Sequence, residues 1–301
     1  MEVTALAVLN PVVSGVVQGS IYGLLGLGIV LLYKSGRIFN FAQAEFGTFA
    51  AFMTAFASEG AGPFPKMPVW AAIVVGLLTG LLLGLAVERL VVRPLFSAPK
   101  VTVVVATAGV TLLLIAVEGF LAGPTPRGAV SVIGGDLLLT DSLRVTNLSG
   151  LIILVLAVLA VVSALFFSRT RTGTAIIAVS QEPTATRLVG ISVERTSALT
   201  WGIAGVLGAV AGILLAGSLG QLAPGILTGV ALVPAFTAAV FGGITALPGA
   251  FLGGVVIGIL QSLVETNVSR DVLPGSGSVI LFVALVVVLL VRPAGLLGKE
   301  T

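Results

Sequence analysis

Apolar runs long enough to cross a bilayer recur along the whole of the 301-residue chain. The run at 9–33 contains no charged residue. A helix of about 20 mainly apolar residues spans the roughly 30 Å of hydrocarbon in a bilayer. The runs lack the regular alternation of apolar and polar residues that marks a transmembrane barrel. The pattern therefore predicts an all-α, polytopic integral membrane helical bundle.

A shorter run at 227–241 contains Pro234 and ends at two glycines, so we expect a broken or tilted helix that still crosses the membrane. With it, the chain has nine crossings in a single transmembrane domain over residues 1–301. If this segment is re-entrant instead, the last two spans reverse their direction. The eight main spans are predicted at 9–33, 40–58, 69–87, 101–121, 150–167, 197–217, 249–263 and 279–291.

Basic residues fall mainly on one side of this map. Nine crossings place the N-terminus outside and the C-terminus in the cytoplasm, and loops rich in Lys and Arg face the cytoplasm. The start MEVTALAVLN lacks the basic region of a cleavable signal peptide, so the first span is expected to be retained. Four basic residues fall outside (Lys66, Arg127, Arg144, Arg270) and eleven inside: Lys34, Arg37, Arg89, Arg93, Lys100, Arg169, Arg171, Arg187, Arg195, Arg292 and Lys299.

Two loops are long enough to carry structure of their own. The outside loop at 122–149 is expected to form a small ordered cap with a hairpin, because it contains Pro, Gly and alternating apolar residues. The inside loop at 168–196 is predicted to fold into one or two short helices. Glu182 and Pro183 would begin the second of these, and Gly190 would end it in a left-handed conformation.

The composition excludes several classes of function. With 57% hydrophobic and 9% charged residues and a mean hydropathy of +1.20, the chain is not a soluble domain. Because Cys and His are absent, disulfides, zinc sites of the usual kind and Ser-His or Cys-His nucleophiles are excluded. The pair Lys34-Ser35 lacks the Gly-x4-Gly-Lys frame of a P-loop. We therefore expect no catalytic, metal or cofactor site in this chain.

Glycines recur at four-residue spacing in four of the predicted spans. Such small-xxx-small faces let helix backbones approach closely. The faces pack helices within the chain, and one of them is open to a second interpretation, as a subunit interface. The residues concerned are Gly15, Gly19, Gly23, Gly76, Gly80, Gly84, Gly208, Gly212, Gly254 and Gly258.

Polar residues inside the spans are candidates for a solute path, because such groups face the bundle interior or a water-filled cavity. Ser14, Gln18 and Tyr22 form a stripe that either lines a path or makes hydrogen bonds between helices. Glu45 and Glu118 are charged, at a cost of about 2.5–3.5 kcal/mol at a helix centre. Glu118 lies near the outer end of its span and is expected to be interfacial.

The stretch NFAQAEF places polar groups at the start of the second span. Asn40 and Gln43 are predicted to cap this helix at the cytoplasmic edge. Glu45 lies just past the first turn, where the helix dipole favours negative charge only weakly. Capping therefore explains Glu45 only in part, and we expect its side chain to face the bundle interior.

Five segments resemble, in the same order, the permease subunits of branched-chain amino-acid ABC importers, and the likeness covers nearly the whole chain. Four motifs follow the N-terminal run: ERLVVRPL, the loop AVSQEPTATRLVGI that resembles a cytoplasmic coupling segment, FTAAVFGGITALPGAFLGG, and VRPAGLLG at the C-terminus. The N-terminal run is GSIYGLLGLGIVLLYKSGRIFNFAQAEFG.

The resemblance implies a permease domain in a bacterial plasma membrane and several partners. These are a second homologous permease subunit, two cytoplasmic ATPases that use ATP and Mg, and an extracytoplasmic solute-binding protein. Glu182, Pro183, Arg187 and Gly190 would form the ATPase coupling segment. The competing class is a self-sufficient secondary carrier or channel, which the broken helix near Pro234 favours and the scarcity of buried charge disfavours.

Departures from the family pattern leave the cargo open among branched-chain amino acids, urea, short amides and other small polar solutes. Gln43 and Ala44 stand where the family often has His and Gly, and Thr245 and Ala246 replace Gly and Ser. Glu45 has two possible roles. It makes a structural hydrogen bond, with Ser14, Gln18 or Tyr22 as donor, or it lines the path and meets the ammonium or amide end of the cargo. The candidate path residues are Ser14, Gln18, Tyr22, Asn40, Gln43 and Glu45.

Overall fold

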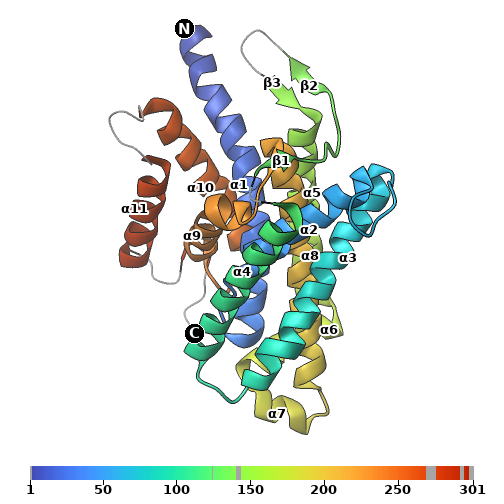
Figure 1. Cartoon of the computed structure of the whole chain (residues 1–301). Helices are drawn as coiled ribbons and strands as arrows, with labels where there is room; N and C mark the ends of the chain where they lie inside the picture. Colours follow the sequence, from blue (N-terminus) through green and yellow to red (C-terminus); the bar gives the residue numbers. More distant parts are fainter. Residues whose placement is uncertain (1, 124, 140–143, 269–275, 292–294, 298–301) are drawn as a thin grey trace. The chain divides into compact units, whose positions relative to one another are not determined.

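The structure is a computed structural model that describes the chain except for residues 1, 124, 140–143, 269–275, 292–294 and 298–301. Arg270, Arg292 and Lys299, which entered the count of basic residues, lie outside the described residues. Figure 1 shows the helices, which are α1 Glu2–Gly36, α2 Gln43–Glu59, α3 Val69–Val87, α4 Lys100–Ala122, α5 Asn147–Arg169, α6 Arg171–Gln181, α7 Pro183–Leu188, α8 Val193–Leu219, α9 Val233–Gly242, α10 Leu247–Asn267 and α11 Ser276–Val291.

These helices confirm the predicted all-α membrane fold. Six described helices are long and apolar enough to cross a membrane: α1, α3, α4, α5, α8 and α10. The predicted spans at 40–58 and 279–291 correspond to α2 and α11, which have 17 and 16 residues. The predicted broken segment is a π-helical turn, Thr228–Leu232 (η3), that continues directly into α9. Whether this segment crosses the membrane fully stays a prediction.

Contacts between Cα atoms divide the chain into two compact units. Helices α1 and α5 each contribute to both, because the boundaries fall inside them. The first unit consists of Met1–Leu27, Ile133–Val161 and Val233–Thr301, and the second of Gly28–Val132 and Val162–Leu232.

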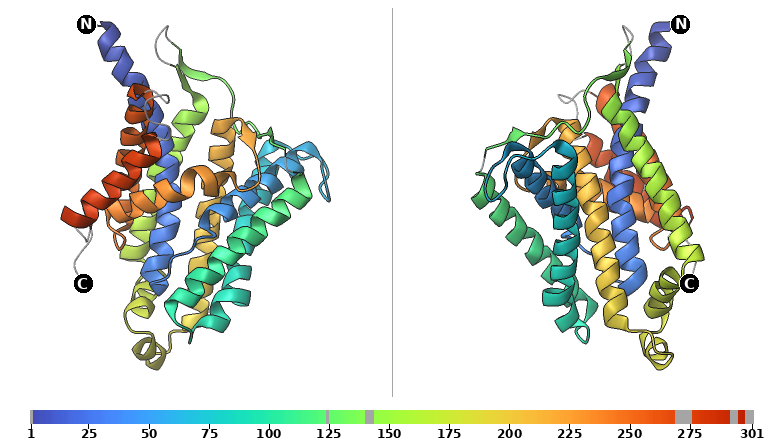
Figure 2. Two further views of the ribbon diagram at one scale, coloured as in Figure 1. Left: turned by 60° about the vertical axis from the view of Figure 1, so that its left-hand side comes forward. Right: turned by 90° about the vertical axis from the view of Figure 1, so that its right-hand side faces the viewer.

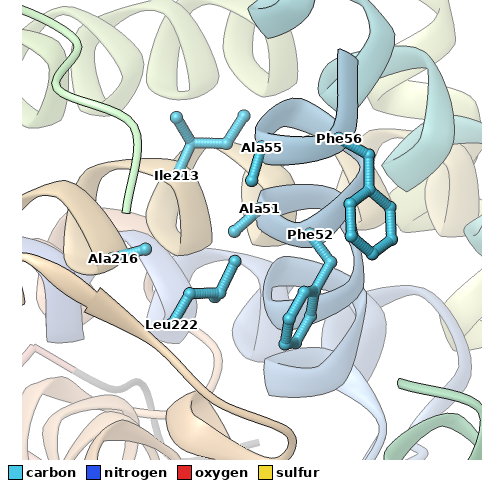
Figure 3. Packing of buried hydrophobic residues seen from close by; sticks show 7 residues of the cluster. All are labelled: Ala51, Phe52, Ala55, Phe56, Ile213, Ala216 and Leu222. Atoms are coloured by element: carbon cyan, nitrogen blue, oxygen red, sulfur yellow. The ribbon is translucent and has the colours of Figure 1, made fainter. Parts of the chain in front are cut away.

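The core of the second unit is built by α2, α3 and α8, which pack against one another. Small and large side chains alternate at the contact. Figure 3 shows Ala51 and Ala55 of α2 facing Ile213 of α8, with Phe52 and Phe56 on the same helix. Close approach depends on glycine: a Cβ at Gly80 of α3 would lie 2.5 Å from the carbonyl oxygen of Gly205 on α8. Ordinary side chains at such positions would force the helices apart.

In the first unit α10 packs against α9 and α11, and Figure 2 shows these three helices together in orange to red. The N-terminal part of α1 lies against α10 through glycine. A Cβ at Gly15 would lie 2.6 Å from Cα of Ile259, and one at Gly254 would lie 2.5 Å from Cα of Gly23. All ten predicted packing glycines have a neighbour of this chain within 4 Å of such a Cβ.

The loop after α4 contains short strands. Strand β2 (Asp136–Leu139) pairs antiparallel with β3 (Arg144–Thr146), which confirms the predicted hairpin. Strand β1 (Arg127–Gly128) pairs antiparallel with β4 (Gln221–Leu222), which follows α8. The second pair links the loop after α4 to the chain just before the broken segment.

Candidate functional site

Glu45 lies in the first turn of α2 and its side chain is fully buried, as predicted for a group facing the interior. Neither of its carboxyl oxygens has a hydrogen-bond partner among the described residues. The groups that interact with this carboxyl are Thr48, Glu118 and Thr228, all in the second unit. A buried carboxyl without a donor is costly, so this position requires an explanation beyond packing.

Glu118 of α4 is 1% exposed, and the expectation that it lies at the interface with solvent was wrong. Its Oε2 accepts a hydrogen bond from the backbone N–H of Gly225 at 3.0 Å. Its Oε1 has no partner among the described residues, and its carboxyl lies close enough to the Glu45 carboxyl for the two groups to interact electrostatically. Two acidic groups from different helices therefore face each other inside the second unit.

Two threonines complete this group, which we call the acidic pair site: Glu45, Glu118, Thr48 and Thr228. Thr228 begins the π-helical turn η3, and its buried hydroxyl has no partner among the described residues. The hydroxyl of Thr48 accepts a hydrogen bond from the backbone N–H of Leu227 at 3.4 Å. The broken segment thus begins directly at the acidic pair site. π-Helical turns occur frequently at functional sites.

Asn40 and Gln43 do not cap α2, so that prediction was wrong. The N-cap residue is Ala42, without a side-chain cap. The Asn40 side chain instead accepts a hydrogen bond from the Ala42 N–H at 3.0 Å, forming a local turn before the helix. The Gln43 side chain donates to the carbonyl oxygen of Ala204 on α8 at 2.8 Å. Both residues are fully buried and hold α2 in place.

The stripe on α1 changes its surroundings along its length. The side chain of Ser14 is exposed, that of Gln18 is half-buried, and that of Tyr22 is buried. The polar side chains close to the Tyr22 hydroxyl are those of Gln261 and Glu265 on α10. These residues belong to the first unit, whereas the acidic pair site belongs to the second.

The loop at 168–196 forms two short helices, α6 and α7, as predicted. Glu182 is the N-cap residue of α7 and Pro183 its first residue, which fits the fixed backbone angle of proline. Gly190 has φ +83°, the left-handed conformation predicted for it. Arg187 pairs with Glu194 at the start of α8 at 2.8 Å. A cavity of about 370 Å³ in the second unit is lined by residues of α6, α7 and α8, together with Lys100 and other neighbours.

One ion pair was missed by the sequence reasoning. Glu88 is 1% exposed, and Arg93 donates to its carboxylate at 2.9 and 3.2 Å. Arg93 also donates to the backbone carbonyl of Glu194 at 3.2 Å, so it links the end of α3 to the start of α8. The π-helical turn Glu88–Val92 after α3 brings the two side chains together. The motif ERLVVRPL thus contains a buried link within the second unit.

In the described part of the chain, no group of three or more His, Cys, Asp or Glu residues could hold a metal ion. The described ion pairs are those of Glu88, Glu59 and Glu194, and none includes Glu45 or Glu118. Among the described residues, no basic side chain therefore forms an ion pair with the acidic pair site.

The sequence matches a family model described as branched-chain amino acid transport system / permease component, over residues 12–291. It is 30% identical to the high-affinity branched-chain amino acid transport system permease protein BraD of Pseudomonas aeruginosa, over 97% of this chain and 96% of that protein. It is 28% identical to the corresponding LivH protein of Escherichia coli strain K12, with the same coverage.

A solved structure, PsaBC from Streptococcus pneumoniae in complex with Fab, aligns with 95% of this chain and 92% of that chain at 15% identity and a TM-score of 0.47. The family model and the full-length relatives confirm the resemblance noted in the sequence. The chain belongs to the family of permease components of branched-chain amino acid transport systems.

Proposed function

We propose that this chain forms one half of the path through which an importer takes up branched-chain amino acids or a related small polar solute. Residues 1–301 act in this proposal as a single transmembrane permease domain. A second, homologous permease subunit completes the path, two cytoplasmic ATPases drive it, and an extracytoplasmic binding protein delivers the cargo. The relatives, which are permease proteins of branched-chain amino acid transport systems, support this cargo.

Membership of the family has direct consequences for the class of the protein. Permease components of this family lack an ATPase domain, so the chain is a transport subunit and not an enzyme, and no cofactor is expected in it. It is a multi-pass membrane protein that works with ATPase and binding-protein partners. A self-sufficient carrier is thereby set aside.

The proposed orientation has the N-terminus outside and the C-terminus in the cytoplasm. The segment around α6 and α7 supports it, because Arg169, Arg171, Arg187 and Arg195 gather there and basic loops face the cytoplasm. The membrane concerned is the bacterial plasma membrane in this proposal.

The α6–α7 segment is the proposed contact with an ATPase. Leu188 and Val189 at the end of α7 are 86% and 73% exposed, although they lie between the spanning helices α5 and α8 and not in a span. Exposed apolar side chains outside the membrane mark a surface that a partner covers. Glu182 and Pro183 start α7, Gly190 ends it, and the Arg187–Glu194 pair joins it to α8, so a displacement of α7 reaches a spanning helix directly.

Glu45 is the proposed cargo contact within the path, and its full burial without an ion-pair partner among the described residues supports this assignment. The other predicted role, a structural hydrogen bond from Ser14, Gln18 or Tyr22, stays a prediction. Asn40 and Gln43 instead fix α2 beside it through their own hydrogen bonds. Ser14, Gln18 and Tyr22, which belong to the first unit, stay candidate path residues in this proposal.

The test is uptake by proteoliposomes that contain the permease pair, the ATPases and the binding protein. The vesicle interior takes the place of the cytoplasm in this assay. Radiolabelled leucine should accumulate inside the vesicles when ATP is supplied there. Glu45→Gln should leave assembly and basal ATPase rate unchanged and lower uptake by about tenfold or more, since it removes a charge from a low-dielectric site. Normal uptake by both Glu45→Gln and Glu45→Ala would remove Glu45 from the path.

A further inference from the structure

The acidic pair site raises a question of charge balance. Two ionised carboxylates in contact inside a low-dielectric interior repel strongly, and each also carries a large desolvation cost. No ion pair of the described residues involves either group. The backbone N–H of Gly225 compensates only Oε2 of Glu118. The site is therefore stable only when it holds one added positive charge, because like-charged carboxyls in contact retain a proton between them.

The unpaired atoms indicate which kind of cationic group fits the acidic pair site. They are both oxygens of Glu45, Oε1 of Glu118 and the hydroxyl oxygen of Thr228, all buried. All four are oxygen atoms able to accept hydrogen bonds. An empty site satisfies them in part by one shared proton between the two carboxyls. A primary ammonium group brings one charge and three N–H donors, which matches more of these acceptors than a single proton does.

We propose that the acidic pair site binds the ammonium group of the cargo in exchange for the shared proton. The proposal rests on the proposed function, since it requires that cargo passes this site. In the empty state one carboxyl is protonated and the other is ionised, with net charge −1. When the cargo ammonium enters, the O–H bond breaks, the proton leaves to water, and two carboxylates hold one ammonium. The net charge counted over these three groups is again −1, and the carboxylate of the cargo, one further negative charge, lies outside the acidic pair site.

This exchange selects the class of cargo. The ammonium group of an amino acid replaces the charge of the shared proton, while the carboxylate of the amino acid stays outside the acidic pair site. Urea and simple amides carry no charge, so they cannot replace the proton, and the two carboxyls keep their shared proton. The site therefore favours amino acids over the neutral solutes that the sequence alone left open. Because Thr228 begins η3, the broken segment contacts the site at which the proton is exchanged.

Infrared spectroscopy of the purified transporter complex tests the proposal, because it detects the carbonyl stretch of a protonated carboxyl without requiring a reagent to reach the site. The wild-type complex without cargo should show this band, and the Glu45→Gln/Glu118→Gln double variant should lack it. Glu88 supplies the matched control: it is equally buried but pairs with Arg93, so Glu88→Gln should leave the band unchanged. Saturating leucine should abolish the band and release one proton per bound leucine.

The analogue 4-methylpentanoate has the carbon skeleton and carboxylate of leucine without the ammonium group, and it should leave the band in place. Absence of the band in the cargo-free wild type, or its persistence with leucine bound, would overturn the proposal. Loss of the band with 4-methylpentanoate would also overturn it. ATP-driven uptake, measured on the same preparation, distinguishes failure of the proton exchange from failure of the proposed function. A complex that imports leucine but lacks the band refutes only the proton exchange. A complete complex that imports no amino acid refutes the proposed function.

Discussion

Replacing Gly80 by Ala probes the contact between α3 and α8, on which the core of the second unit depends. The added Cβ would lie 2.5 Å from the carbonyl oxygen of Gly205 and 2.6 Å from Cβ of Ala209. Ordinary contacts begin at 3.4 Å, so the helices must separate by close to 0.9 Å (3.4 minus 2.5). Overpacking of this kind costs about 1–3 kcal/mol. The gain from Ala over Gly within a helix offsets about 0.5–1 kcal/mol of this.

Gly109→Ala is the matched control, because Gly109 lies in α4 and a Cβ there would meet nothing within 4 Å. Both variants share the helix gain, so the difference between them isolates the overpacking cost of about 1–3 kcal/mol. Fluorescence-detected size-exclusion chromatography after heating gives the melting temperature of each variant in the assembled complex. Gly80→Ala should melt several degrees below Gly109→Ala. Equal melting temperatures would refute the inference that backbone contact between α3 and α8 limits stability.

Three further predictions concern coupling, the buried ion pair and the partners. Gly190→Val should strain the left-handed position by about 1–2 kcal/mol and uncouple ATP hydrolysis from uptake in an assembled complex, whereas unchanged uptake per ATP would count against a coupling role for α7. Glu88→Gln should destabilise the complex by about 1–3 kcal/mol because Arg93 loses its carboxylate, while Glu194→Gln, in an exposed pair, should change it by about 0.5 kcal/mol or less in denaturation curves. Proteoliposomes with this chain alone should accumulate no solute under an imposed proton or sodium gradient, and clear accumulation would contradict the division of labour with ATPases.

Apolar runs located the spanning helices well where local signals mark their ends. The predicted span at 69–87 has the same bounds as α3, which begins after Pro68 and continues at Glu88 as a π-helical turn. The turn at Gly190 was also predictable, since glycine readily adopts positive φ after a helix. These features depend on neighbours in the sequence, and the sequence therefore contains the information needed to find them.

Features that depend on distant residues were not predictable in this way. Glu118 was expected near solvent because its neighbours in sequence suggest the end of a span, whereas packing against α2 and the turn at Gly225 buries it. Asn40 was expected to cap α2, but its side chain accepts a hydrogen bond from the N–H of Ala42, which is itself the N-cap residue of the helix. The partner of Gln43 is a carbonyl on α8, and no pattern of spacing identifies it.

The interleaving of the two units has a consequence for synthesis in the cell. Gly19 in α1 packs on the backbone of α10 at Gly254, so the first helix to be made waits for one of the last before its packing surface is covered. The second unit lies between these segments, within residues 28–232, and all of its helices can be present before α10 leaves the ribosome. Chains that stop before α10 should therefore contain a folded second unit and a first helix whose glycine face toward α10 is uncovered.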